Sequence, residues 1–200
     1  MFFQEIDETI SGWMLKLHGN DFINQTMKFF SLIGEAGIIW ILILVLLLIV
    51  VVSRKKKCPV VLLFAGLFLL IGWLFNDYCL KLLIHRSRPY LNHEAFGTAF
   101  EDFMVSIHYS FPKGYSFPSG HSFSSFNAAT GIALYKKKLG FLTYPIAFLI
   151  AFSRIFLGAH YFTDVLIGSL IGIAFGFLSH FLGKKLFQSE KIRNHPKFTE

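Results

Sequence analysis

The sequence predicts an all-α fold: a polytopic bundle of five clear transmembrane helices plus an N-terminal amphipathic helix, six spans in all if that helix also crosses the membrane. Three observations support this fold. Of the 200 residues, 54% are hydrophobic and only 16% are charged, and the mean hydropathy is +0.56. Apolar runs such as 37–52 approach the roughly 20 residues that a spanning helix needs. Short clusters of Lys and Arg separate these runs, as in the loops of a membrane protein.

The N-terminal region, residues 1–26, is expected to begin along the membrane surface. Residues 2–18 carry apolar side chains at helical spacing and polar side chains elsewhere, which is typical of an amphipathic helix in the interface. Glu5, Asp7 and Glu8 stand where a secretory signal peptide would need basic residues, so no signal peptide is predicted. Whether this region spans the membrane or lies on it stays open.

The spans follow in order within one membrane-embedded domain over residues 1–200. The third span is weakly hydrophobic because Ser122, Ser124, Ser125 and Asn127 lie near its start, so other helices should shield it. In the fifth span, a glycine at every fourth residue from 168 to 176 favours close helix packing. Each expected span is apolar and bounded by polar residues: about 36–52, 59–80, 119–135, 139–157 and 161–183.

Charge predicts which way the bundle faces. Twelve of the 19 Lys and Arg residues follow the first, third and fifth spans, which the positive-inside rule makes cytoplasmic. The basic residues that give the net charge of +7 are therefore attributed to the orientation of the protein in the membrane, and no nucleic-acid partner is expected. The polar tail 184–200 should be cytoplasmic and mobile. The polar, aromatic segment 90–118 is long enough to be an outer-face lid or binding loop.

Three polar clusters should meet on the outer, extracytoplasmic face. In the first, Lys81 and Arg88 are seven residues apart, so on a helix they would share a face, and Pro89 should end that helix. In the second, Pro118 and Ser119 suit a helix start, and Gly120 lets backbone come close. Free amides at such a helix start form an anion site.

The third cluster contains Arg154, His160 and Asp164 at the junction of two spans. If the residues after Gly158 are helical, His160 and Asp164 lie one turn apart on one face, and the carboxylate can orient the imidazole as a nucleophile or base. The alternative is that the Arg and His merely anchor helix ends at the membrane interface.

Together the clusters supply cationic and hydrogen-bonding groups of the kind that bind a tetrahedral phosphate dianion. Arg can hold its oxygens in bidentate fashion, and no carboxylate ligands for Mg²⁺ are evident in the clusters, so we expect neither a metal nor another cofactor. A structural zinc site made from His121 and His160 is the competing interpretation. The expected phosphate-binding groups are Lys81, Arg88, Ser119, Gly120 and Arg154.

The three clusters resemble the three signatures of the type-2 phosphatidic acid phosphatase superfamily, the membrane lipid phosphate phosphatases. The matching patterns are Lys81-x6-Arg88-Pro89, Pro118-Ser119-Gly120-His121 and Ser153-Arg154-x5-His160-x3-Asp164. The resemblance implies that His160 attacks phosphorus to form a phosphohistidine, that Asp164 orients it, and that His121 protonates the leaving oxygen. Family members usually have six spans, one more than the clear spans of this chain.

The short length and amphipathic start look like bacterial undecaprenyl pyrophosphate phosphatases, which act on an isoprenoid pyrophosphate in the cell membrane. Phosphatidylglycerophosphate phosphatases share every signature residue, so phosphatidylglycerophosphate or phosphatidic acid remains an alternative substrate. A transporter or a non-catalytic protein that binds phosphorylated lipids is a further alternative. The expected partners are thus a lipid phosphate or pyrophosphate and the membrane lipids, and the oligomeric state stays open.

Overall fold

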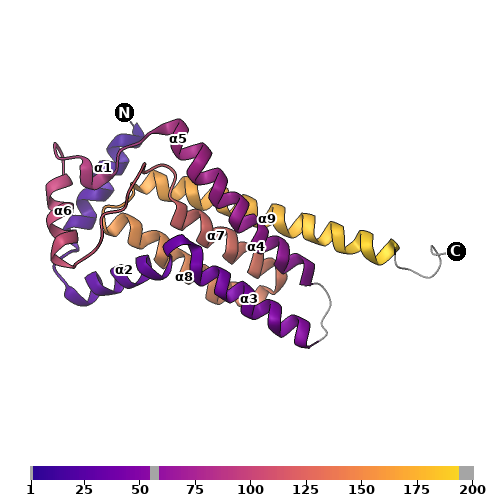
Figure 1. Cartoon of the computed structure of the whole chain (residues 1–200). Helices are drawn as coiled ribbons and strands as arrows, with labels where there is room; N and C mark the ends of the chain where they lie inside the picture. Colours follow the sequence, from indigo (N-terminus) through magenta and orange to yellow (C-terminus); the bar gives the residue numbers. More distant parts are fainter. Residues whose placement is uncertain (1, 55–58, 194–200) are drawn as a thin grey trace.

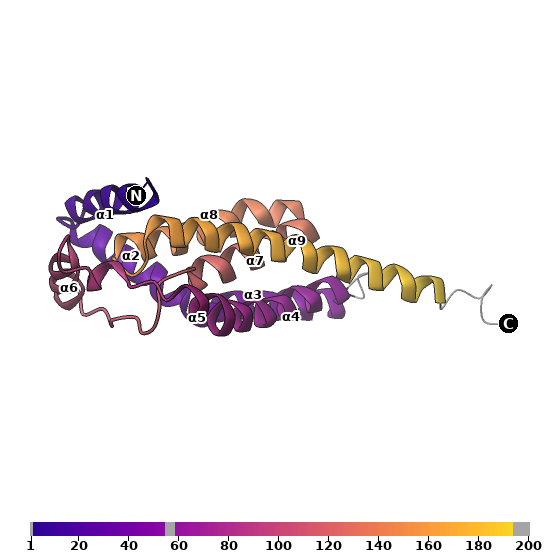
Figure 2. The same ribbon diagram turned by 90° about the horizontal axis from the view of Figure 1, so that it is seen from above.

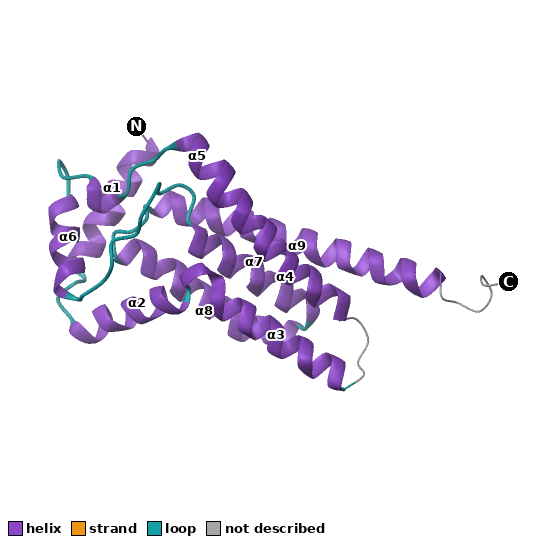
Figure 3. Cartoon of the chain, in the orientation of Figure 1, coloured by secondary structure: helices purple, strands orange, loops and turns teal. Residues whose placement is uncertain are grey.

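The computed structural model describes residues 2–54 and 59–193 and confirms the all-α prediction, since these residues contain helices and no strand (Figure 3). The N-terminal region forms α1 and α2, and the segments that follow it include a short 3₁₀ turn (η1), a π-helical turn (η2) and a second 3₁₀ turn (η3). The elements run in this order: α1 Phe2–Lys16, α2 Asp21–Ile33, η1 Glu35–Gly37, α3 Ile38–Ser53, α4 Pro59–Phe75, η2 Asn76–Leu80, α5 Lys81–Ile84, η3 Pro89–Leu91, α6 Gly97–Ser106, α7 Gly120–Tyr135, α8 Lys137–Phe156 and α9 Phe162–Arg193.

Helix α7 lies at the centre of the bundle and packs against α4, α8 and α9 (Figures 1 and 2). Several of its buried polar side chains have partners on neighbouring helices. Ser125 Oγ accepts a hydrogen bond of 2.9 Å from the indole of Trp40, and Asn127 donates one of 3.0 Å to the Phe68 carbonyl. The prediction that other helices shield the weakly hydrophobic span is confirmed.

The glycine stripe of α9 faces α7. A Cβ added to Gly168 would lie 2.6 Å from the Ser119 carbonyl oxygen, and one added to Gly176 would lie 2.9 Å from the Asn127 carbonyl oxygen. No side chain fits at such distances, so the stripe lets the two backbones approach, as predicted. One consequence is that the start of α9 is held close to the start of α7.

Four helices of the described residues are long and apolar enough to cross a membrane: Glu35–Ser53, Val60–Leu91, Lys137–Phe156 and Phe162–Gln188. The remaining predicted span, the third in chain order, corresponds to α7, which is only 16 residues long and is enclosed by the others. Helix α3 shows the opposite environment, because large apolar side chains such as Leu42 and Leu46 are exposed along it. Exposed side chains of this kind suit a surface that faces lipid.

Two predicted boundaries differ from the structure. Helix α9 does not end near residue 183 but continues to Arg193 and projects beyond the bundle (Figure 1). Residues 184–188 include Lys, Leu and Gln and no Gly or Pro, so nothing in their sequence stops a helix. Segment 90–118 is partly helical, because α6 packs into the protein through the fully buried Phe100 and Met104. The predicted basic residues 55–57 and the end of the tail lie outside the described residues.

The N-terminal helix α1 contacts α8 and α9 at one end of the bundle (Figure 2). Its 15 residues extend about 22 Å, less than the hydrocarbon core of about 30 Å. Phe3 and Trp13 on it are exposed, whereas Asp7, Ser11 and Met14 are buried. This pattern suits a helix that lies along the interface, with an unexpected carboxylate on its buried face.

Candidate active site

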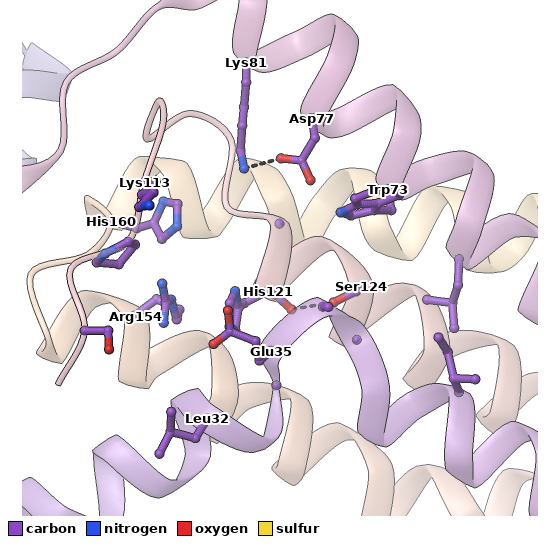
Figure 4. Close-up of a pocket in the computed structure, with 18 of the residues that line it drawn as sticks. Leu32, Glu35, Trp73, Asp77, Lys81, Lys113, His121, Ser124, Arg154 and His160 are labelled. Carbon is purple, nitrogen blue, oxygen red and sulfur yellow. Dashed lines mark hydrogen bonds and ion pairs between the residues drawn. The ribbon is translucent and has the colours of Figure 1, made fainter.

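The three polar clusters converge on one pocket of about 630 Å³, at the end of the bundle where α1 and α6 lie (Figure 4). Six of the eight predicted site residues line this pocket, while Ser119 and Asp164 are fully buried beside it. Residues more than 70 positions apart in the sequence thus meet there. The six lining residues are Lys81, Arg88, Gly120, His121, Arg154 and His160.

Lys81 and Arg88 reach the pocket, but they do not share a helix face as predicted. Helix α5 ends at Ile84, and His85 has a left-handed backbone with φ of 52°. Arg88 is extended, as expected before a proline. Its guanidinium donates to the Ala159 and Lys113 carbonyls at 2.8 and 2.9 Å, while the ammonium group of Lys81 forms an ion pair with Asp77. Arg88 is therefore aimed by long-range contacts, whereas Lys81 is held by an ion pair with a residue four positions earlier in the chain.

The second cluster caps α7 as predicted. Ser119 is the N-cap, and its Oγ accepts hydrogen bonds from the Ser122 amide at 3.4 Å and the Ser122 hydroxyl at 2.9 Å. Gly120 begins the helix and lines the pocket, so the positive helix end faces it. The Ser119 hydroxyl stabilises the helix start and retains its own proton for a further acceptor.

Arg154 enters the pocket from the end of α8. Its Nη1 donates to the hydroxyl groups of Ser31 on α2 and Tyr109, and these two hydroxyls lie 2.7 Å apart. His121 stands close by on α7 (Figure 4), and its Nε2 is buried without a hydrogen-bond partner among the described residues. A buried ring nitrogen beside a pocket is suited to exchange a proton with a bound molecule.

His160 and Asp164 are close, but not on one helix. Gly158, with φ of 64°, follows α8, and α9 begins only at Phe162, so His160 lies in the turn between them. His160 Nδ1 lies 3.7 Å from Asp164 Oδ2, which is longer than a hydrogen bond, and His160 Nε2 lies 3.2 Å from Arg88 Nη1. The prediction of adjacent groups therefore holds, but the helical reason given for it is wrong.

Burial, and then the positive charges of Arg88, Arg154 and Lys81, hold the pKa of His160 well below its ordinary value of 6.5. The ring is therefore neutral at neutral pH. A neutral ring nitrogen has a lone pair, which an attack on an electrophile requires.

The comparisons with known proteins agree with this geometry. The model of the PAP2 superfamily matches residues 58–187, which include all three clusters. The chain belongs to the PAP2 superfamily. Its members are membrane phosphatases that act on lipid phosphates, so this chain is a member of a family of hydrolases. No curated protein matches the chain significantly.

Two solved PAP2-type structures are similar along most of this chain. One is a transmembrane PAP2 type phosphatidylglycerolphosphate phosphatase from Bacillus subtilis, with 25% identity, a TM-score of 0.64, and coverage of 91% of this chain and 86% of that one. The other is LpxE from Aquifex aeolicus, with 23% identity, a TM-score of 0.61, and coverage of 90% and 94%, respectively. At 23% identity, the similarity to LpxE shows a shared fold and nothing more.

The PAP2 signatures leave out several residues that hold the site together. Asp7, Arg86 and Ser116 surround Asp164 or its neighbour Thr163, and Ser31 and Tyr109 hold Arg154. For Asp7 the sequence does contain a signal, because this carboxylate lies on the apolar face of an amphipathic helix. Arg86 and Ser116 had no such signal, because no periodic pattern connects them to Asp164.

The charge of this PAP2 pocket comes mainly from basic side chains. Within residues 2–54 and 59–193, no three His, Cys, Asp or Glu side chains gather as ligands for a metal ion. Four cations line the pocket, namely Lys81, Arg88, Lys113 and Arg154, together with the carboxylates of Glu35 and Asp77.

Proposed function

We propose that this PAP2 protein hydrolyses an isoprenoid pyrophosphate of the undecaprenyl type at the outer face of the cell membrane, without a metal, through a phosphohistidine. The observation that carries the proposal is the arrangement of His160. Its Nε2 lies 3.2 Å from Arg88 Nη1, and its Nδ1 faces Asp164 at 3.7 Å. His121 lines the same pocket.

The proposed reaction has two displacements. In the first, the lone pair of His160 Nε2 attacks phosphorus, the bond to the leaving oxygen breaks, and His121 supplies the proton that this oxygen takes up. Asp164 stabilises the positive ring that forms. In the second, water that gives a proton to His121 attacks phosphorus, the P–N bond breaks, and inorganic phosphate leaves.

The phosphate oxygens would be held by Lys81, Arg88 and Arg154, with the Ser119 hydroxyl and the Gly120 amide at the start of α7. Fixed cations and amides stabilise the charge that develops on a transferring phosphoryl group. Asp77 pairs with Lys81 in the present structure. A bound phosphate would therefore share that ammonium group with Asp77 or displace the carboxylate.

The rest of the pocket suits a phosphorylated lipid. The pocket also has an apolar lining, which includes Ile41 of α3 and Leu69, Leu70 and Trp73 of α4. Trp73 is labelled in Figure 4. Lys113 adds a fourth cation beyond the three in the signatures, which favours a headgroup with two phosphates.

A second candidate substrate is a lipid phosphomonoester, either phosphatidylglycerophosphate or phosphatidic acid. It is favoured by the similarity to the phosphatidylglycerolphosphate phosphatase from Bacillus subtilis over 91% of this chain. Binding or transport of a phosphorylated lipid without hydrolysis would need the cations, but not two pocket histidines and an acid beside one of them.

A substrate panel tests the proposal and separates the candidates. We expect purified protein in detergent to release phosphate from an isoprenoid pyrophosphate in the presence of EDTA, and Lys113→Ala to raise KM for that substrate about tenfold. The same variant should change KM for phosphatidylglycerophosphate much less. Faster hydrolysis of the monoester by the wild type would select the second candidate, and phosphate release that needs added Mg²⁺ would refute the metal-free reaction. Binding without any release would leave the non-enzymatic alternative.

The position of the site on the outer face can be tested by labelling. In a variant without Cys58 and Cys79, we expect a cysteine at Lys113 to react with a membrane-impermeant thiol reagent in intact cells, and one at Lys137 to react only after lysis. Both positions are exposed. Lys113 lines the pocket with Gly120 at the start of α7, and Lys137 follows the other end of α7. The reverse labelling would place the pocket at the cytoplasmic face.

A further inference from the structure

A carboxylate on the N-terminal helix lies next to the start of α9. Asp7 has no exposed surface, although it belongs to a helix whose other acidic residues, Glu5 and Glu8, are solvent-accessible. Its Oδ1 accepts a hydrogen bond of 2.9 Å from the Thr163 amide, and its Oδ2 accepts one of 2.6 Å from the Thr163 hydroxyl. A buried charge of this kind is costly unless it is paired, so its partners define what it does.

Asp7 caps α9 from a different helix. Thr163 is the second residue of α9, so its amide is one of the four that lack a partner within the helix. A carboxylate at this position satisfies the amide and also interacts favourably with the positive helix end. Asp7 therefore fixes the backbone one residue before Asp164.

Arg86 joins Asp7 to Asp164. Its Nη2 lies 2.6 Å from Asp7 Oδ2, and its Nη1 lies 2.6 Å from Asp164 Oδ1. The guanidinium also stacks 4.1 Å above the centre of the Tyr161 ring. One planar cation thus neutralises two buried carboxylates and sets the separation between them.

The other oxygen of Asp164 is occupied as well. Oδ2 accepts from the Tyr161 amide at 2.9 Å and from the Ser116 hydroxyl, and it is the oxygen that faces His160. Donors on both oxygens hold the Asp164 carboxylate in one position. The distance of 3.7 Å between Asp164 Oδ2 and His160 Nδ1 depends on that position. A shift of less than 1 Å would decide whether a hydrogen bond forms.

We propose that Asp7 and Arg86 are positioning residues for the nucleophile, which act on His160 through Asp164. The N-terminal helix α1 is then part of the catalytic apparatus. This inference rests on the proposed function, because it assumes that His160 is the nucleophile. If the charge of Asp7 is removed, Asp164 is the only anionic partner that Arg86 keeps among the described residues, and Arg86 draws that carboxylate away from the histidine.

The test is a double-mutant cycle on the rate of phosphoenzyme formation in a single turnover of the full-length protein. Asp7→Asn keeps the shape of the side chain and should lower this rate about 10- to 100-fold, with little change in substrate affinity. In an Asp164→Asn background, the same substitution should change the rate less than about twofold, because the group through which it acts has been altered. Glu5→Gln, on the exposed face of the same helix, is the matched control and should have no effect.

Arg86 provides a second, independent variant. Arg86→Lys keeps one charge near both carboxylates and should retain more activity than Arg86→Ala, with thermal unfolding in detergent followed for each protein. A purely structural role would lower the unfolding temperature and reduce the rate by the same factor in both backgrounds of the cycle, which would overturn the inference. So would an Asp7→Asn protein as active as Glu5→Gln. An active wild type that forms no phosphoenzyme would instead refute the proposed nucleophile, and this inference with it.

Discussion

Replacing His160 with alanine is expected to abolish phosphate release, with a loss of about 10⁴-fold or more, because the variant has no group that can form the covalent intermediate. The ring is buried and 2% of its surface is exposed, but its removal leaves a small pocket-side cavity, not a hole in the apolar core. The protein should therefore remain folded. The measurements are phosphate release, the trapping of an acid-labile phosphoenzyme, and thermal unfolding in detergent.

The matched control for this variant is His93→Ala. His93 lies between η3 and α6, is exposed, and its Nδ1 is 3.8 Å from Glu101 Oε2, outside the pocket. It should retain wild-type activity, since its ring does not line the pocket on which the three clusters converge. Substantial turnover by a well-folded His160→Ala protein would show that another group attacks phosphorus.

Replacing His121 with alanine is expected to have the second-largest effect, and its size should depend on the leaving group. An alkoxide that leaves from a lipid phosphomonoester is a poor leaving group and needs a proton in the transition state. A phosphate that leaves from a pyrophosphate is already stable as an anion. General acid catalysis is worth roughly 10²–10⁴ in rate, and the need for it falls as the leaving group becomes more acidic. The loss should therefore be larger for phosphatidic acid than for an isoprenoid pyrophosphate.

The quantity to measure is the single-turnover rate of phosphoenzyme formation, because the activation of water in the second displacement would otherwise mask the difference. An aryl phosphate with an acidic phenol is the control substrate, and it should be affected least. Equal losses on all three substrates would indicate that His121 binds phosphate or maintains the pocket, and donates no proton. The unpartnered Nε2 beside the pocket leaves this ring able to exchange a proton with a bound molecule.

Much of the site was predictable because its residues lie next to features that are encoded locally. Ser119 and Gly120 form a helix start whose capping preference does not depend on the rest of the protein. Pro89 makes Arg88 extended for a steric reason that acts on one residue only. The spans themselves follow from apolar composition, since a helix satisfies its backbone hydrogen bonds internally.

The sequence by itself thus determined the helical class, the order of the spans and the residue types that meet at the pocket. Only the tertiary structure decided how these residues are held. The position of Arg88 depends on the carbonyls of Lys113 and Ala159, and the orientation of Asp164 depends on Asp7 and Arg86. Hydrogen bonds of this kind join groups 25 to 156 residues apart, and helix periodicity relates only residues three or four positions apart. A long-range contact between charged side chains leaves no such period in the sequence, so it becomes visible only when the chain has folded.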